Sequence, residues 1–333
     1  MRQLRRVATT ALFLAVVLAV VGVGLLRQGS SGHCTASRTL VPRCGAWWGM
    51  YLPVSEDNQL PQVVAAQDNY LGRSLDIVER YHDMSLSSDG TFPDQAEEQV
   101  ARNHRILFSW AADVWSTNTL HRWSTIASGQ LDKPVIVPEA KRLRAFPHTV
   151  FLTFSAEPDG EVPEQGTPAQ FVAAWRHIHT VFADQGVHNV IWVWTTEGYL
   201  PHASTIAALY PGNAFVDWIG YDPYNYFSCH QTHWQTFSQT VDPFYNWILR
   251  QPFGNKPIML SEFGSAADPR NPGRLPAWYQ GIITAVQKLP RLKALVQWNA
   301  SIPGCFLGIP KNSPTAEAYR QTGLSLYFRQ EAP

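Results

Sequence analysis

Charged residues are scarce and evenly balanced in this chain of 333 residues. They make up 16% of the sequence, with 26 Lys and Arg against 26 Asp and Glu, and the formal net charge is zero. A protein that follows a nucleic-acid backbone needs a strongly basic surface. The balance therefore excludes nucleic acid as an expected partner.

Several short motifs that bind cofactors or metals are missing. The sequence has no G-x-G-x-x-G or G-x-x-x-x-G-K-[ST] phosphate cradle, no H-E-x-x-H pair and no C-x-x-C pair. It also lacks the G-x-S-x-G nucleophile elbow of serine ester hydrolases. Because each motif supplies a specific ligand geometry, we expect no cofactor and no metal. An exported hydrolase of non-sugar esters is an alternative function, but no motif supports it.

The chain has only four cysteines, which allow at most two disulfides in three possible pairings. We favour Cys34 with Cys44, which are close in sequence, and Cys229 with Cys305, which would join two late segments. Free buried thiols are the alternative.

The N-terminus carries the one long apolar run. Three arginines precede an uncharged stretch, Val7–Leu26, that is long enough to cross a bilayer core of about 30 Å. We assign residues 1–27 to a signal peptide or uncleaved membrane anchor, 28–43 to a Gly- and Ser-rich tether, and 44–333 to one domain. The expected location is extracellular or at the cell surface, with membrane contact if the segment stays uncleaved; a buried core helix is the alternative.

Aromatic residues are abundant, at 12% of the chain with 13 Trp, and hydrophobic residues reach 45%. This content excludes a disordered chain and supplies a large core. Flat rings also stack on sugars, so a sugar-binding cleft competes with simple interior packing as their role.

Eight short apolar runs alternate with amphipathic stretches, which predicts repeated β-α units of the α/β class. A single-domain (β/α)8 TIM barrel is the expected fold, and a doubly wound open sheet is the alternative. The predicted strands are Ala46–Leu52, Leu75–Arg80, Ile106–Trp110, Val150–Phe154, Val190–Trp194, Val216–Tyr221, Ile258–Ser261 and Leu295–Asn299.

The clearest predicted helix lies between the fourth and fifth strands. Thr167 can cap its start, Pro168 suits its first turn, and Gly186 can adopt the left-handed conformation past its end. Further helices are expected at Pro93–Asn103, Trp234–Arg250 and Ala277–Leu289.

Two glutamates follow apolar runs at predicted strand ends. Glu157 comes three residues after Val150–Phe154, and Glu262 follows Ile258–Ser261 directly. In a parallel barrel the carboxyl ends of the strands form the functional face, so both side chains should reach one mouth. Two converging carboxyl groups suit glycoside hydrolysis by double displacement, in which one attacks and the other donates and later accepts a proton.

Five motifs in this order resemble the retaining β-glycanases of glycoside hydrolase family 26, a (β/α)8-barrel group that includes endo-β-mannanases. The resemblance spans roughly residue 45 to the C-terminus. The motifs are GAWWG at 45–49, FSAEPDG at 154–160, NVIWVW at 189–194, VDWIGYDPYN at 216–225 and KPIMLSEFG at 256–264.

The resemblance implies a role for several residues. Glu157 is similar to the acid/base, Glu262 to the nucleophile, and Tyr224 to the residue that orients the nucleophile. Trp298 is similar in position to the ring that floors the cleavage subsite. The expected activity is hydrolysis of a β-linked polysaccharide or oligosaccharide, β-mannan first and β-glucan or xylan next. Further candidates for substrate contacts are Trp110, Trp194 and Tyr226.

One motif departs from the family pattern. Family members usually have a histidine before the acid/base and an asparagine two residues after it, where this chain has Ala156 and Asp159. Asp159 is therefore an alternative acid. The departure also motivates an alternative function, a catalytically impaired barrel that binds carbohydrate at the cell surface.

Overall fold

The computed structural model describes residues 35–86 and 90–328. Thr35 begins the compact unit that holds the strands and helices below. The predicted leader, residues 1–27, lies outside the described residues, as does Cys34. Within the described part of the chain, no helix combines the length and apolar character needed to cross a membrane.

Eight parallel strands form a closed barrel. Their order is β11-β1-β2-β3-β6-β7-β8-β10, and β10 also pairs with β11, which closes the sheet. The barrel strands are β1 (Trp47–Tyr51), β2 (Ile77–His82), β3 (Arg105–Trp110), β6 (Val150–Phe154), β7 (Val190–Thr196), β8 (Trp218–Tyr221), β10 (Ile258–Ser265) and β11 (Leu292–Trp298).

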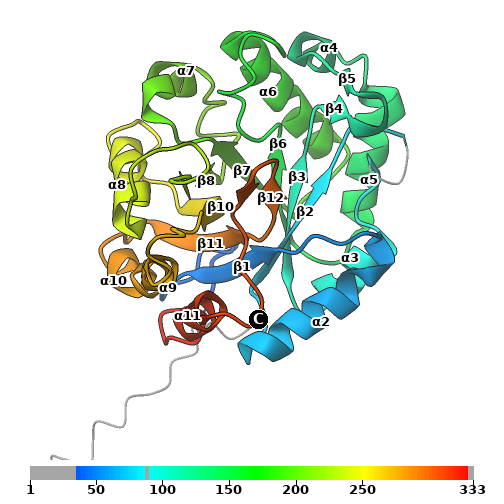
Figure 1. Ribbon diagram of the computed structural model, residues 1–333. Coiled ribbons are helices and arrows are strands. Elements are labelled where there is room, and N and C mark those ends of the chain that lie inside the picture. The colour runs from blue at the N-terminus through cyan, green and yellow to red at the C-terminus, as the bar shows by residue number, and fades with distance from the viewer. Residues whose placement is uncertain (1–34, 87–89, 329–333) are drawn as a thin grey trace, which may run out of the picture. The chain divides into compact units, whose positions relative to one another are not determined.

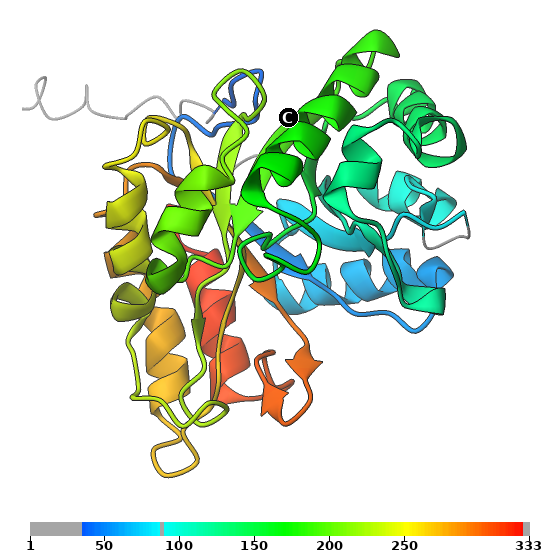
Figure 2. The same ribbon diagram turned by 90° about the horizontal axis from the view of Figure 1, so that it is seen from above.

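Each of these strands contains or overlaps one predicted apolar run. The (β/α)8 barrel is confirmed in its closed parallel sheet, and the open doubly wound sheet is wrong because β10 and β11 pair. Figure 1 shows the helices around the outside of the strands, and the view from above shows the same arrangement (Figure 2).

The helices lie in the connections between strands. They are α2 (Leu60–Leu71), α3 (Gln95–Ala101), α4 (Trp123–Ala127), α5 (Val137–Ala145), α6 (Pro168–Asp184), α7 (Ala203–Ala208), α8 (Phe237–Ile248), α9 (Arg274–Gln280), α10 (Ile282–Val286) and α11 (Pro314–Gly323). Short strand pairs are β4 (Asp113–Val114) with β5 (Thr119–Leu120) and β12 (Ser301–Ile302) with β13 (Cys305–Phe306), while β9 (Tyr224–Asn225) extends the end of β10.

Helix α6 begins as its capping residues predict. The Thr167 side chain accepts a hydrogen bond from the Gln170 backbone N–H, and the Gln170 side chain accepts one from the Thr167 N–H. Gly186, just past the end, has φ 75°, where a side chain would be strained. The prediction of one helix over Ala277–Leu289 is wrong in detail, because α9 and α10 are separate helices that meet at Gly281.

Alternate strand residues fill the barrel interior. The interior cluster comprises Trp47, Ile77, Leu107, Phe151, Ile191, Val193, Trp218, Met259, Ala294 and Val296, all buried. Their neighbours on each strand face the surrounding helices and belong to the larger cluster. This period-2 alternation decides which strand residues can reach the mouth of the barrel.

The segment 35–43 packs against the interior cluster. Leu40 and Val41 contact it, the Trp47 indole donates to the Leu40 carbonyl at 2.7 Å, and the Trp218 indole donates to the Thr39 carbonyl at 2.7 Å. This part of the expected tether is therefore held against the barrel, and the compact unit includes it from Thr35 onward.

Candidate active site

A pocket of about 620 Å³ opens at the carboxyl ends of the barrel strands. Glu157 and Glu262 both line it, so two residues 105 positions apart in sequence share one cavity. Among the predicted substrate contacts, Tyr224, Tyr226 and Trp298 line the same pocket. The convergence expected from the positions of the strand ends is present.

Glu262 reaches the pocket because β10 is irregular at this point. The register of β10 against β11 shifts between Leu260 and Phe263. Ser261 lies toward the barrel interior, where its hydroxyl meets the Thr195 hydroxyl at 3.2 Å. The bulge turns the next side chain, Glu262, into the mouth, which is a recurrent use of β-bulges beside active sites.

Two phenol groups donate hydrogen bonds to the Glu262 carboxylate. The Tyr81 hydroxyl donates to Oε1 at 2.6 Å, and the Tyr224 hydroxyl donates to Oε2 at 2.5 Å. Burial raises the pKa of Glu262, and these two hydrogen bonds oppose that rise. Both oxygens are therefore fixed in orientation, and the ionised form is the one that the phenols stabilise.

Glu157 has a different environment from Glu262. It follows β6 with φ 55°, and its backbone N–H donates to the Thr195 carbonyl at 3.2 Å, which ties it to β7. Among residues 35–86 and 90–328, no group donates a hydrogen bond to its carboxylate. Burial, and next the charge of Glu262, raise the pKa of Glu157 well above its usual value. Glu157 therefore retains a proton more strongly than Glu262.

Two further carboxyl groups lie under the pocket. Burial and the charge of Glu262 raise the pKa values of Glu79 and Asp222 well above their usual ranges. Asp222 Oδ1 also accepts a hydrogen bond from the Glu262 backbone N–H at 2.8 Å, which helps to hold the bulge. Because buried like charges repel, these two groups favour their neutral forms and leave the negative charge on Glu262.

The aromatic side chains divide into pocket residues and core residues. The Trp298 ring is stacked with Tyr51, with ring centroids 6.3 Å apart, and lies edge-on to Tyr224 at 6.2 Å. Trp298 is half-buried and lines the pocket. The placement of Trp110 and Trp194 differs from the prediction. Trp110 is 0% exposed and Trp194 is 1% exposed, and neither lines the pocket.

Strand alternation explains why these two tryptophans miss the pocket. Both lie on the strand face that points toward the helices, opposite to Leu107 and Val193 on the same strands. Trp110 packs against Phe92 and Phe154 on that outer face. They are core residues rather than substrate contacts.

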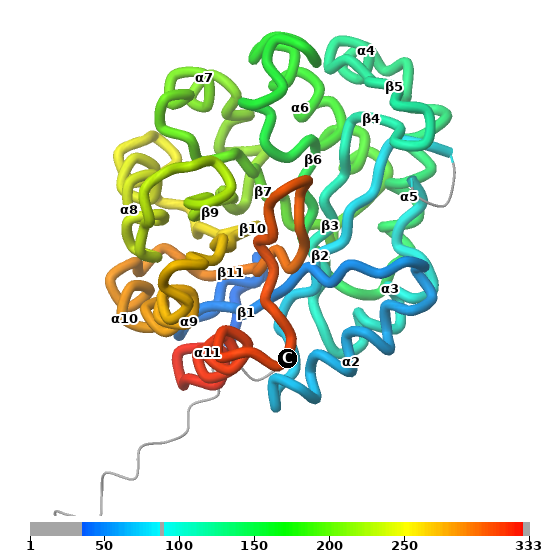
Figure 3. The backbone as a smooth tube through the Cα atoms, viewed as in Figure 1, coloured from blue at the N-terminus to red at the C-terminus, as the bar shows by residue number. Residues whose placement is uncertain are grey.

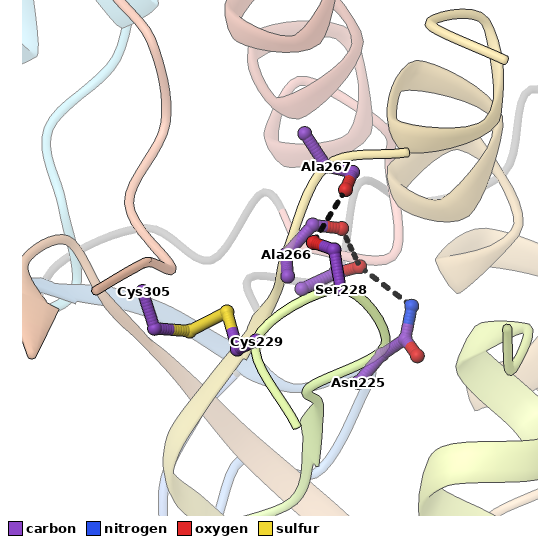
Figure 4. Close-up of a disulfide and its surroundings, with 7 residues drawn as sticks. Asn225, Ser228, Cys229, Ala266, Ala267 and Cys305 are labelled. Carbon is purple, nitrogen blue, oxygen red and sulfur yellow. Dashed lines mark hydrogen bonds between the residues drawn. A yellow bond between two sulfur atoms is a disulfide. The ribbon is translucent and has the colours of Figure 1, made fainter. Parts of the chain in front are cut away.

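A disulfide joins two loops beside the pocket. Cys229 and Cys305 are bonded, with a Cα–Cα distance of 5.1 Å, which confirms the predicted late pairing (Figure 4). Cys305 lies in the β12–β13 hairpin, whose Ser301 and Ile302 line the pocket. The tube view shows this part of the chain, in orange, running in front of the barrel strands (Figure 3).

Hydrogen bonds fix the other loop to the end of β10. The Asn225 amide donates to the Ser265 hydroxyl at 2.9 Å, and the Ser228 hydroxyl donates to the Ala267 carbonyl at 3.0 Å (Figure 4). The loop that carries Tyr226 is therefore held from two sides. The pairing expected for Cys34 stays a prediction, because that residue lies outside the described part.

Asp159, the alternative acid, does not line the pocket. Its carboxylate accepts a hydrogen bond from the Glu197 backbone N–H at 3.1 Å and lies 3.7 Å from the His202 imidazole. The geometry therefore favours Glu157 over Asp159 as the proton donor in the pocket.

The sequence prediction missed Tyr81, Tyr51, Glu79 and Trp115. Tyr51, Tyr81 and Trp115 line the pocket, and Glu79 lies beneath it. The period-2 pattern of the strands indicates three of them. Tyr51 lies on the same inward face of β1 as Trp47, and Glu79 and Tyr81 lie on the same inward face of β2 as Ile77. Trp115 lies between β4 and β5, and no periodicity points to it.

Comparisons with known proteins agree with this architecture. The sequence model of glycosyl hydrolase family 26 matches residues 160–250. Endoglucanase H of Acetivibrio thermocellus is 27% identical over 287 residues, which cover 82% of this chain; the match spans 29% of that protein's length. These matches confirm the resemblance to family 26 and support a glycoside hydrolase.

Solved structures of similar fold include a family 26 β-mannanase from Bacteroides ovatus and a modular endo-β-1,4-mannanase from Cellulomonas fimi. The first has a TM-score of 0.61 at 16% identity and covers 85% of this chain and 89% of its own. The second has a TM-score of 0.57 at 14% identity, and the match covers 85% of this chain and 71% of the Cellulomonas fimi chain. Identities this low show the fold alone. The alternative of a carbohydrate-binding barrel without activity gains no support from any of these matches.

Proposed function

We propose that this chain, whose resemblance to family 26 is confirmed, is a retaining endo-β-glycanase that cleaves a β-linked polysaccharide, with β-mannan as the first substrate and β-glucan as the next. One observation carries the proposal. Glu262 receives two phenol hydrogen bonds, while the Glu157 carboxyl group in the same pocket receives none from the part of the chain that the structure describes. The two carboxyl groups are thereby suited to opposite protonation states.

The proposed reaction has two displacements. The Glu262 carboxylate attacks the anomeric carbon as Glu157 transfers its proton to the departing glycosidic oxygen, which leaves a glycosyl ester on Glu262. Glu157, now a carboxylate, then removes a proton from a water molecule whose oxygen attacks the same carbon. The ester bond breaks, and both residues return to their starting states.

The remaining pocket residues serve this reaction by position. Tyr81 and Tyr224 hold the two oxygens of the nucleophile, so its attacking lone pair keeps a fixed direction. The half-buried Trp298 ring lines the pocket, and its flat apolar surface suits a platform for a pyranose at the point of cleavage. The Ala156 side chain carries no polar group, so it offers the substrate no hydrogen bond beside Glu157.

Substrate and mechanism can be tested together. The full chain is incubated with soluble β-mannan, β-glucan and xylan, and the anomeric form of the fresh reducing end is followed by NMR. We expect cleavage of mannan or glucan with the β-anomer appearing first. An α-anomer released first from a β-linkage would refute double displacement.

Variants separate the two roles. Glu262→Gln should remove hydrolysis of all substrates, whereas Glu157→Gln should retain activity on aryl β-glycosides with good leaving groups and respond to added azide. Glu164→Gln, an exposed glutamate on the same loop, is the matched control and should behave as the wild type. Equal losses for both variants on every substrate, without azide rescue, would contradict the assignment.

We also propose that the protein acts outside the cell or at its surface. The apolar N-terminal run and the Cys229–Cys305 disulfide support this location, because disulfides persist in oxidising compartments. Fractionation of cells that express the full chain should place it in the membrane or the medium, and recovery in the cytosolic fraction would oppose the proposal.

A further inference from the structure

Three ligand-type side chains meet beside the pocket but outside it. Asp159 lies on the loop after β6, Glu197 follows the end of β7, and His202 precedes α7. One carboxylate oxygen of each acid and a ring nitrogen of the histidine lie within 4.8 Å of one another. None of the three residues lines the pocket that holds Glu157 and Glu262.

Two of these atoms are buried without a hydrogen-bond partner. Asp159 is 4% exposed, and its Oδ2 has no partner among the described residues, although its Oδ1 accepts from the Glu197 backbone N–H. His202 Nδ1 is likewise out of solvent contact and without a hydrogen bond. It lies 3.7 Å from Asp159 Oδ2 and 3.5 Å from Glu197 Oε2, too far for good hydrogen bonds.

Such spacing fits atoms that share a metal ion. Two ligand atoms that are each about 2.0–2.1 Å from a tetrahedral Zn²⁺ lie about 3.3 Å from each other. His202 Nδ1 lies 3.7 Å and 3.5 Å from the two carboxylate oxygens, which is only a few tenths of an ångström more. An imidazole with two carboxylates is a zinc-type ligand set, since Ca²⁺ and Mg²⁺ prefer oxygen ligands alone. The Glu197 side chain is 34% exposed, so water can approach the cluster from the Glu197 side as the fourth ligand.

The local backbone leaves room for this arrangement. Gly160 follows Asp159, and a Cβ atom at this position would lie 2.5 Å from Glu197 Oε1. A side chain at 160 would therefore displace the Glu197 carboxylate from its present position.

We propose that Asp159, Glu197 and His202 bind one divalent cation of the zinc class. The ion clamps the loop that carries Glu157 to the loop that follows β7. The site is separate from the proposed glycanase chemistry, and it takes part in no bond-making step.

The test uses the full chain, stripped with EDTA and dialysed into metal-free buffer. ZnCl2 binding is measured by equilibrium dialysis with metal analysis, and thermal unfolding is followed with and without Zn²⁺. We expect a stoichiometry of one Zn²⁺ per chain. At a free Zn²⁺ concentration of about 100 times Kd, we expect Tm to rise by about 4 °C. CaCl2 at the same concentration should leave Tm unchanged.

Asp159→Asn and His202→Ala should each weaken this binding at least tenfold. His233→Ala, which removes another exposed histidine, is the control and should bind Zn²⁺ as the wild type does. Unchanged Zn²⁺ binding in both variants would overturn the proposal.

A protonated His202 paired with the two acids is the competing arrangement. In that case His202→Ala would lower Tm equally with and without Zn²⁺, and this result would also overturn the proposal. Gly160→Ala provides a second check that leaves all three ligands in place; we expect it to weaken Zn²⁺ binding by displacing Glu197.

Discussion

The two phenol hydrogen bonds to Glu262 give a prediction that separates its protonation from its position. Tyr81→Phe removes the donor to Oε1, at 2.6 Å, and keeps the ring. A hydrogen bond to a charged group contributes about 1.5–3 kcal/mol, and 1.36 kcal/mol corresponds to one pKa unit. The variant should therefore raise the pKa of Glu262 by about 1–2 units.

The sign of the effect on activity follows from the role of the group. A nucleophile must be ionised, so the acidic limb of the kcat/KM profile should move to higher pH by about 1–2 units. The basic limb reports loss of the proton from Glu157, and Tyr81 makes no hydrogen bond to that residue. The basic limb should therefore stay within a few tenths of a pH unit.

The assay is kcat/KM against pH on the polysaccharide that proves active. Tyr51→Phe is the matched control, because Tyr51 lines the same pocket and packs edge-on against Tyr81 at 4.8 Å, without a hydrogen bond to Glu262. An acidic limb that stays in place in Tyr81→Phe, or that moves equally in Tyr51→Phe, would refute the reasoning.

Three further predictions concern stability. Gly220→Ala would place a Cβ atom 2.4 Å and 2.6 Å from two hydroxyl oxygens inside the barrel. It should lower the free energy of unfolding, measured in urea, by about 1–3 kcal/mol. A Cβ atom at Gly273 would have no described atom within 4 Å, so Gly273→Ala should change this free energy little. Glu79→Gln removes a carboxyl whose pKa is raised on folding. Because the folded state holds that proton more tightly, the wild type should lose stability relative to the variant as pH rises above about 4.5, measured at pH 5 and pH 8. Thr167→Ala should cost about 1 kcal/mol by removing the α6 cap, and the exposed Thr180→Ala in the same helix should stay within about 0.5 kcal/mol.

The strands and one helix could be predicted because local chemistry determines them. Apolar runs such as Val150–Phe154 match a barrel strand to the residue, since strands covered on both faces read as continuous hydrophobic segments. Helix α6 carries its own start and stop signals in Thr167 and Gly186. Boundaries elsewhere were less accurate, as where Gly281 divides the predicted last helix.

Two aromatic residues face away from the pocket because of strand alternation. Trp110 and Trp194 end their predicted strands, but both have the outward parity. Tyr81 has the inward parity, yet it fell one residue beyond the predicted strand Leu75–Arg80. A period-2 count from Ile77 along β2 directs Tyr81 to the mouth. The same count from Leu107 along β3 directs Phe108 and Trp110 away from it.

Glu262 shows why alternation alone is also insufficient. Met259 and Ser261 point inward, so an unbroken strand would send Glu262 outward among the helices. The register shift before Phe263 turns the Glu262 side chain inward instead. The hydrogen bond from the Glu262 backbone N–H to the Asp222 carboxylate stabilises this conformation. Glu157 likewise depends on a positive φ after its strand. Both the bulge and the positive φ cost conformational energy, and tertiary contacts stabilise them. The motif around each glutamate therefore predicts that the residue lies at the mouth. The backbone conformation that turns its side chain into the pocket depends on contacts with other strands of the folded barrel.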